Sequence, residues 1–420
     1  MTRKVLVLLF CATVVLCAAA PLAFGQEQAN APKPRLRALH TVKPGRGLTK
    51  EMINSMVSRS ASSSTSNSLP LWLFNVQSNR DFNDYTGVMV GTDPFNGGAG
   101  QSNIKTQVVP LIIRTHKVGV RVNTKNIIST KPGVTTFDPT VPNTACLAAP
   151  NDVPVTLFQQ SPIIKPADFN YGGTDVGRTQ AIDAFQRANF WRVIDRASYH
   201  VRLSPVQTLA PITINIPAAS GLALATTALG PPAFCAPMGI MDIFLFDSIV
   251  TNQILPALAA QGVNPGTFPI FFLSNVVMSI GSPTNLNNCC VLGYHGTNST
   301  VPIQTYSPVD FDSTGLFGSG ILDTAVASHE VGEWMNDPFG DNPTPPWGHI
   351  GQQPGCQGNL EVGDALTGTE APRIAMPNGF TYHLQELAFF SWFFSSDSIG
   401  VNGWFSDNGT FLTDAGPPCH

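Results

Sequence analysis

The chain has 420 residues, enough for one large domain or two smaller ones with a substantial buried core. Charged residues make up only 12% of it and the net charge is −4, which argues against a nucleic-acid partner. The 37 glycines and 35 prolines favour a loop-rich fold with many short strands.

Residues 1–25 have the pattern of a secretory signal peptide. Arg3 and Lys4 precede an apolar run over residues 5–20, and small residues surround a cleavage position near Gly25. The run is shorter than a bilayer span, and no later segment has an uninterrupted apolar stretch of membrane length. We therefore predict a secreted or periplasmic protein, without stable membrane insertion once the signal is removed.

Cysteine usage agrees with export. Six cysteines remain after the signal, an even number that predicts disulfides: Cys146, Cys235, Cys289, Cys290, Cys356 and Cys419. We expect the adjacent Cys289 and Cys290 to bond to two different partners, and Cys356 to staple the loop that carries Glu361. None of the spacings matches a paired-cysteine metal knuckle.

Residues 26–68 are predicted to form a flexible leader or linker. The first part is polar, basic and contains prolines, and residues 58–68 are rich in serine. A solvated spacer is the favoured interpretation and a pro-segment is the alternative.

Residues 69–170 are predicted to form a β-rich region. Short apolar or alternating runs, separated by Asn, Gly, Asp and Pro, predict strands over residues 71–76, 85–90, 107–114 and 118–122. Pro110 lies inside the third run and indicates an edge strand or a bulge there.

Residues 171–420 mix helical and strand patterns, so the predicted fold class of the whole chain is α+β. Strands are predicted over residues 199–201, 212–216, 268–277, 290–295 and 304–309. Helices are predicted over residues 181–191, 241–261 with a kink or break at Pro256, 323–336 with Asp323 as N-cap, and 380–394.

The helix over residues 323–336 carries the most informative motif. His329 and Glu333 are four residues apart, so they lie on one helix face about 6 Å apart along the axis. An imidazole and a carboxylate in this arrangement can bind one metal ion. Glu330 lies beside them and could take a proton from a water on that ion.

This motif resembles the H-E-x-x-H helix of secreted zincin-type metallopeptidases, with Glu333 in place of the second histidine. The resemblance implies metal ligation by His329 and general-base catalysis by Glu330. It also implies a zincin-like domain with one active-site helix after the β-rich region. More loosely, the order of motifs resembles bacterial and fungal relatives of phosphate-induced, EXORDIUM-like secreted proteins. That order runs through Asn336-Asp337-Pro338, Trp347 and Glu361-Val362-Gly363-Asp364.

A catalytic metal needs a third protein ligand, which the helix does not supply. Asp337 lies too far along the axis, although Pro338 favours a bend that could return its carboxylate. We rank Glu361 first and Asp364 second, the latter as ligand or as partner of His329, and assign Asp337 to capping or bracing.

The predicted cofactor is one divalent metal ion, with zinc chosen through the resemblance. A site of one histidine and two carboxylates also suits manganese or iron. It would make a bound water less acidic than three histidines would, and so shift activity to higher pH.

Other side chains near the motif allow a functional and a structural interpretation. His349, Tyr382 or His383 could stabilise an oxyanion. For His349 a surface position is favoured, and for Tyr382 and His383 a place in the core. His295 ends a predicted strand, and we interpret it as structural.

Two functions follow. The leading hypothesis is an exported metal-dependent hydrolase, a peptidase acting on a protein or peptide. The alternative is a non-catalytic secreted binding or cell-surface protein with a structural or vestigial metal site. In that case the aromatic residues Trp72, Phe74 and Tyr85 of the β-rich region would bind glycans or another protein.

Overall fold

The computed structural model describes residues 35–38, 68–143, 147, 152–298, 301–350, 355–369, 373–413 and 419. All of them belong to one compact unit, Lys33–His420. The predicted signal peptide, most of the predicted leader and Cys146 lie outside the described residues.

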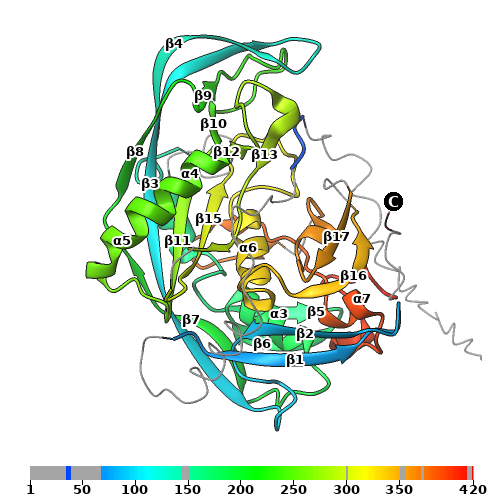
Figure 1. Ribbon diagram of the computed structural model, residues 1–420. Coiled ribbons are helices and arrows are strands. Elements are labelled where there is room, and N and C mark those ends of the chain that lie inside the picture. Colours follow the sequence, from blue (N-terminus) through cyan, green and yellow to red (C-terminus); the bar gives the residue numbers. More distant parts are fainter. Residues whose placement is uncertain are drawn as a thin grey trace, which may run out of the picture. The chain divides into compact units, whose positions relative to one another are not determined.

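A mixed sheet organises the unit, and β3 (Gly100–Val122) is its longest strand (Figure 1). This strand pairs with β4 (Ile128–Phe137), β7 (Tyr199–Thr208), β8 (Ile212–Ile216), β9 (Gly221–Leu224) and β11 (Thr267–Ser274). Only the pairing with β4 is antiparallel. Because β3 lies in the predicted 69–170 region and β7 to β11 in the 171–420 region, the two regions share one sheet. Strands and helices together give a mixed α+β fold.

The sheet continues on both sides of β3. On one side β11 pairs with β15 (Thr305–Phe311), which pairs with β14 (Gly296–Thr297). On the other side β9 leads to β10 (Met238–Asp242), β12 (Val276–Ser279) and β13 (Cys289–Val291). Only Asn275 separates β11 from β12, so the sheet curls back on itself.

Strands such as β11, β12 and β15 are buried on both faces, and they divide their side chains between two cores. On β11, Ile270 and Phe272 belong to one hydrophobic cluster, whereas Phe271 and Leu273 belong to the other. This alternation follows from the period of two along a strand. It explains why residues 268–273 are continuously apolar, as is typical of strands covered on both faces.

One face of the sheet is covered by a long, broken helix (Figure 1). It consists of α4 (Ile243–Ile249), a π-helical turn (Val250–Ile254), α5 (Leu255–Leu258) and a 3₁₀ turn (Ala259–Gln261). The π turn comes just before Pro256, where the sequence predicts a kink. Within the described residues this is the one helix long and apolar enough to cross a membrane, and its buried side chains belong to the core on this face.

The opposite face of the sheet is covered by α6 (Ala325–Asn336), whose twelve residues are all buried. The Trp334 ring stacks on Phe268 of β11 with 3.6 Å between ring centroids, and its Nε1 donates to Thr305 Oγ1 of β15 at 3.0 Å. The helix ends before Asp337, as expected for the residue preceding Pro338. The motif helix is therefore fixed rigidly on the sheet.

Smaller elements surround α6. They are the hairpin β1 (Leu71–Gln77) and β2 (Asp84–Val90), helix α2 (Pro154–Gln160), the hairpin β5 (Ala167–Tyr171) and β6 (Thr174–Thr179), helix α3 (Ala181–Asn189), strands β16 (Pro343–Gly348) and β17 (Cys356–Asn359), strands β18 (Ile374–Ala375) and β19 (Thr381–Tyr382), and helix α7 (Phe390–Phe394). Short 3₁₀ turns cover Leu286–Asn288, Asp364–Leu366 and Val401–Gly403.

The prediction of an edge strand or bulge at Pro110 is wrong, because β3 is paired along both edges. Proline is tolerated there because of where it lies. On one edge it falls between the β7 pairing, which ends at Val108, and the β8 pairing, which begins at Leu111. On the other edge it is the last residue paired with β11. The backbone N–H that proline lacks would therefore fall between the two sets of strand-pairing hydrogen bonds.

Three further local predictions are corrected. The helix predicted over residues 380–394 is limited to Phe390–Phe394, because residues before it are extended and take part in β19 and in a bridge at Ala388. Trp72 and Phe74 are buried, in edge-on contact with Phe190 and Phe390, and so are not a binding surface. Tyr85 is half-buried.

Asp323 does not cap α6. The N-cap residue is Thr324, without a side-chain capping bond. The Asp323 carboxylate instead accepts hydrogen bonds from the backbone N–H and the Nδ1 of His383, at 2.9 and 2.6 Å. The Asp323 carboxylate thus bonds to a residue 60 positions later in the chain and not to the first turn of α6.

The disulfides differ in part from expectation. Cys289 and Cys290 bond to each other, so the prediction of two separate partners is wrong. Cys356 at the start of β17 bonds to Cys419, which ties the loop before Glu361 to the C-terminal segment as predicted. Cys235 is also disulfide-bonded.

Candidate metal centre

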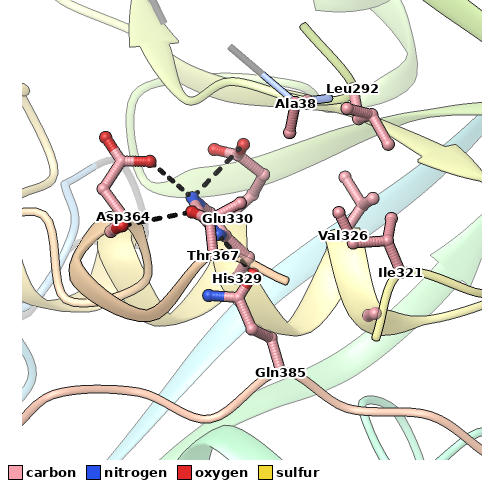
Figure 2. Close-up of a pocket in the computed structure, with 11 residues that line it drawn as sticks. Ala38, Leu292, Ile321, Val326, His329, Glu330, Asp364, Thr367 and Gln385 are labelled. Atoms are coloured by element: carbon pink, nitrogen blue, oxygen red, sulfur yellow. Dashed lines mark hydrogen bonds and ion pairs between the residues drawn. The ribbon is translucent and has the colours of Figure 1, made fainter. Parts of the chain in front are cut away.

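His329, Glu333 and Asp364 bring three potential metal ligands together. Figure 2 shows two of them, His329 and Asp364, with Glu330 beside them. The Nε2 atom of His329 lies 3.1 Å from Glu333 Oε1 and 3.4 Å from Asp364 Oδ1. One ligand atom from each residue lies within 4.8 Å of the others, and all three residues are buried. For ligand–metal distances of about 2.1 Å at tetrahedral angles, ligand atoms lie about 3.4 Å apart. The donor set therefore fits one divalent cation.

The orientation of the His329 ring is fixed by Gln385. His329 Nδ1 donates to Gln385 Oε1 at 3.0 Å, and Gln385 Nε2 donates to the carbonyl oxygen of Gly363 at 2.6 Å. Because a carbonyl only accepts, the Gln385 amide must present its oxygen to the imidazole. The Nε2 lone pair of His329 then faces the carboxylates, which is the arrangement that metal-binding histidines show.

Gly363 gives the His329 ring its space. A Cβ at this position would lie 2.7 Å from Cγ and Nδ1 of the imidazole. The same turn also holds Glu333, since the backbone N–H groups of Gly363 and Asp364 donate to Glu333 Oε1 at 3.2 and 3.0 Å. The segment after β17 thus supplies the potential ligand Asp364, holds the Glu333 carboxylate by hydrogen bonds and leaves room for the His329 ring.

Glu330 lies in the cavity beside this group. Its Oε1 is 4.0 Å from His329 Nε2, close enough to reach a water molecule on an ion held there. A Cβ on Gly293 would lie 2.8 Å from Glu330 Cγ, so only glycine leaves room for this carboxylate. The cavity has an apolar wall that includes Leu292, Ile321 and Val326 (Figure 2).

Part of the predicted flexible leader is docked at this cavity. Arg35 Nη1 and Nη2 donate to the carbonyl oxygens of Pro232 and Gly230, at 2.5 and 3.1 Å. The backbone N–H groups of Arg35 and Leu36 both donate to the carbonyl oxygen of Leu316. Ala38 is buried and lines the cavity with His329 and Glu330. Residues 35–38 of the predicted leader therefore contact the folded unit and the wall of the cavity.

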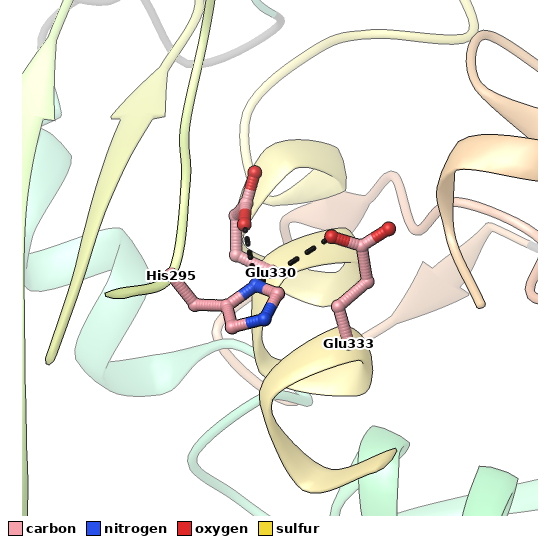
Figure 3. A group of neighbouring side chains, drawn as sticks. All are labelled: His295, Glu330 and Glu333. Atoms are coloured by element: carbon pink, nitrogen blue, oxygen red, sulfur yellow. Dashed lines mark ion pairs between the residues drawn. The ribbon is translucent and has the colours of Figure 1, made fainter. Parts of the chain in front are cut away.

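His295 forms a second group with Glu330 and Glu333 (Figure 3). Its Nδ1 lies 3.5 Å from Glu330 Oε2 and 3.6 Å from Glu333 Oε2. The sequence interpretation as a purely structural histidine missed this position. The only local signal is Gly293 two residues earlier, whose close approach to Glu330 brings the segment to the helix.

The remaining predicted ligands lie apart from the His329 group. Glu361 Oε2 is 3.9 Å from His295 Nε2, and its Oε1 accepts from Asn359 Nδ2 at 2.6 Å. Asp364, ranked second from the sequence, is thus the carboxylate placed with His329 and Glu333. The Asp337 carboxylate accepts from the backbone N–H groups of Asp341 and Asn342 and braces the turn after α6.

The candidate oxyanion residues do not line the cavity. Tyr382 is buried and its hydroxyl donates to the carbonyl oxygen of Leu157. His383 pairs with Asp323. His349 donates from Nδ1 to the carbonyl oxygen of Asp364, next to the ligand turn, with its ring against Trp347.

Charge dominates the electrostatics of the His329 group. Burial by itself opposes protonation of the imidazole. The carboxylates of Glu333, Asp364 and Glu330 outweigh that effect and raise the pKa of His329 well above its usual value. The group therefore strongly attracts positive charge, whether a proton or a metal ion.

Comparisons with known proteins do not assign this site to a family. No family model, curated protein or solved structure matches the chain.

Proposed function

We propose that the protein is an exported metal-dependent hydrolase, with peptide bonds as its substrates. One observation carries this proposal: His329, Glu333 and Asp364 converge within ligand distance of a common point, with Glu330 beside them in a cavity. The order of elements supports the zincin resemblance, since strands precede a single buried motif helix and a ligand follows from a downstream turn.

When bound, a divalent cation would polarise a substrate carbonyl and lower the pKa of water. Glu330 would accept the proton of the attacking water through Oε1, which lies 4.0 Å from His329 Nε2. Gln385 would hold the His329 ring in its tautomer. The apolar wall near Leu292, Ile321 and Val326 would receive an apolar substrate side chain.

Export is part of the proposal. The disulfides Cys289–Cys290 and Cys356–Cys419 suit an oxidising compartment, and residues 1–25 have the signal pattern. Zinc is the proposed ion, with manganese or iron as competitors for a site rich in carboxylates.

The test compares the full chain with the Glu330→Gln variant on an unfolded, fluorescently labelled protein substrate. We expect cleavage by the wild type, its loss on treatment with a chelator, and its return when Zn²⁺ or Mn²⁺ is added. The variant should retain the ion at His329 and lose about 10²–10⁴-fold in kcat. Asp168→Asn, which changes an exposed acid outside the site, serves as control and should cleave normally.

Stoichiometric metal together with unchanged turnover in Glu330→Gln would remove Glu330 from the mechanism. Failure of the metal-loaded wild type to cleave any unfolded protein or peptide would reject the peptidase proposal.

A further inference from the structure

We infer that a second divalent cation binds next to the first, held by His295, Glu330 and Glu333. The inference rests on the proposed metal site at His329, because the two sites share Glu333. It concerns cations such as Mn²⁺, Fe²⁺ or Zn²⁺, which accept one imidazole and two carboxylates as ligands.

The tautomer of His295 is set by the end of α6. His295 Nε2 lies 2.8 Å from the carbonyl oxygen of Asp337, and because a carbonyl only accepts, Nε2 must carry the hydrogen. In the neutral ring, Nδ1 then presents a lone pair to the carboxylates of Glu330 and Glu333. This repeats the arrangement at His329, where Gln385 fixes the far nitrogen.

The distances favour a cation over a direct hydrogen bond. His295 Nδ1 lies 3.5 Å from Glu330 Oε2 and 3.6 Å from Glu333 Oε2 (Figure 3). A charged imidazolium donating to a carboxylate would approach to about 2.7–2.9 Å. Two ligands of one tetrahedral ion with bonds of about 2.1 Å lie about 3.4 Å apart. The observed separations match the second case.

Glu333 connects the two sites. Its Oε1 lies 3.1 Å from His329 Nε2, and its Oε2 lies 3.6 Å from His295 Nδ1. One carboxylate therefore presents a different oxygen to each imidazole. A carboxylate used in this way bridges two ions, which in binuclear hydrolytic sites are about 3.5–4 Å apart.

A single ion shared by both histidines does not fit the arrangement. Among the described residues, no group of three or more potential ligands with donor atoms within 4.8 Å of one another contains both His295 and His329. Glu330 likewise divides its oxygens, with Oε2 3.5 Å from His295 Nδ1 and Oε1 4.0 Å from His329 Nε2. One oxygen can then bind the second ion while the other accepts the proton in the proposed reaction.

The test is metal stoichiometry of the full chain, measured by equilibrium dialysis against Mn²⁺ and elemental analysis. We expect two Mn²⁺ per wild-type chain, one in His295→Ala and one in His329→Ala. His116→Ala, which removes an exposed histidine outside both groups, should bind two. Electron paramagnetic resonance should show an exchange-coupled pair in the wild type and an isolated six-line signal in His295→Ala.

One Mn²⁺ per wild-type chain, or a coupled pair that survives in His295→Ala, would overturn the inference. The wild-type measurements need no variant, and His295→Asn keeps a donor for the Asp337 carbonyl should the alanine variant fold poorly. Loss of all metal in His295→Ala would indicate one shared ion and also reject the second site. One ion with chelator-sensitive cleavage would reject the second site alone, whereas two ions without cleavage would reject only the hydrolase.

Discussion

Adding one methyl group at Gly363 should damage the metal centre without altering any ligand. The Cβ of Gly363→Ala would lie 2.7 Å from Cγ and Nδ1 of His329 and 2.9 Å from its Cε1. Such atoms need about 3.5 Å, so the ring would have to move by about 0.8 Å. The backbone at Gly363 has φ −85° and ψ −40°, which alanine adopts freely, so the effect is steric alone.

The displaced ring would lose its 3.0 Å hydrogen bond to Gln385 and its alignment with Glu333 and Asp364. We expect metal affinity to fall about 10–100-fold, as for loss of a supporting contact. Turnover should fall about 100-fold, as for a misplacement of about 1 Å. Overpacking should lower the free energy of unfolding by about 1–3 kcal/mol.

Competition with a chromophoric chelator gives the affinity, and urea unfolding gives the stability. Gly358→Ala in β17 is the matched control, because its Cβ would meet nothing closer than the Thr344 carbonyl oxygen at 3.7 Å. Equal metal affinity in the two variants would refute the steric argument and the placement of His329 against Gly363.

Three further predictions concern access and stability. Arg35→Ala removes the contacts to Pro232 and Gly230, so residues 35–38 should leave the cavity. Chelators should then extract the metal faster and turnover should rise. Unchanged rates of both would show that this segment does not limit access to the cavity. Trp334→Ala should lower the free energy of unfolding by about 3–5 kcal/mol in urea titrations, and a loss under 1 kcal/mol would contradict the anchoring of α6. Burial raises the pKa of Asp312 to about 6, so the folded state favours its protonated form. The contribution of Asp312 to the free energy of unfolding should therefore be fully present below pH ~4 and be lost, by on the order of 3 kcal/mol, as the pH rises through about 6. This slope should be smaller in Asp312→Asn, and identical pH profiles would contradict the assignment.

Local sequence patterns predicted correctly those elements whose position depends on their own residues and not on distant ones. The apolar residues over 268–277 predicted one buried strand, and two buried strands, β11 and β12, separated by Asn275, occupy this range. The spacing of His329 and Glu333 predicted two ligands on one helix face, and α6 presents both. Pro338 predicted where that helix ends.

Predictions failed where a distant partner decides the outcome. Asp323 pairs with His383 instead of capping its own helix, and Pro110 lies in a central strand because of how β7 and β8 divide the edge of β3. Gln385 and His295 have no sequence spacing that relates them to α6. Only the folded chain brings Gln385 behind His329 and His295 opposite Glu333.

Anomalous X-ray diffraction from crystals of the full chain grown with Zn²⁺ tests the metal centre most directly. We expect a peak about 2.0–2.2 Å from His329 Nε2, Glu333 Oε1 and Asp364 Oδ1. Well-ordered side chains at this position without an anomalous peak, or zinc bound only elsewhere on the molecule, would contradict the proposed site.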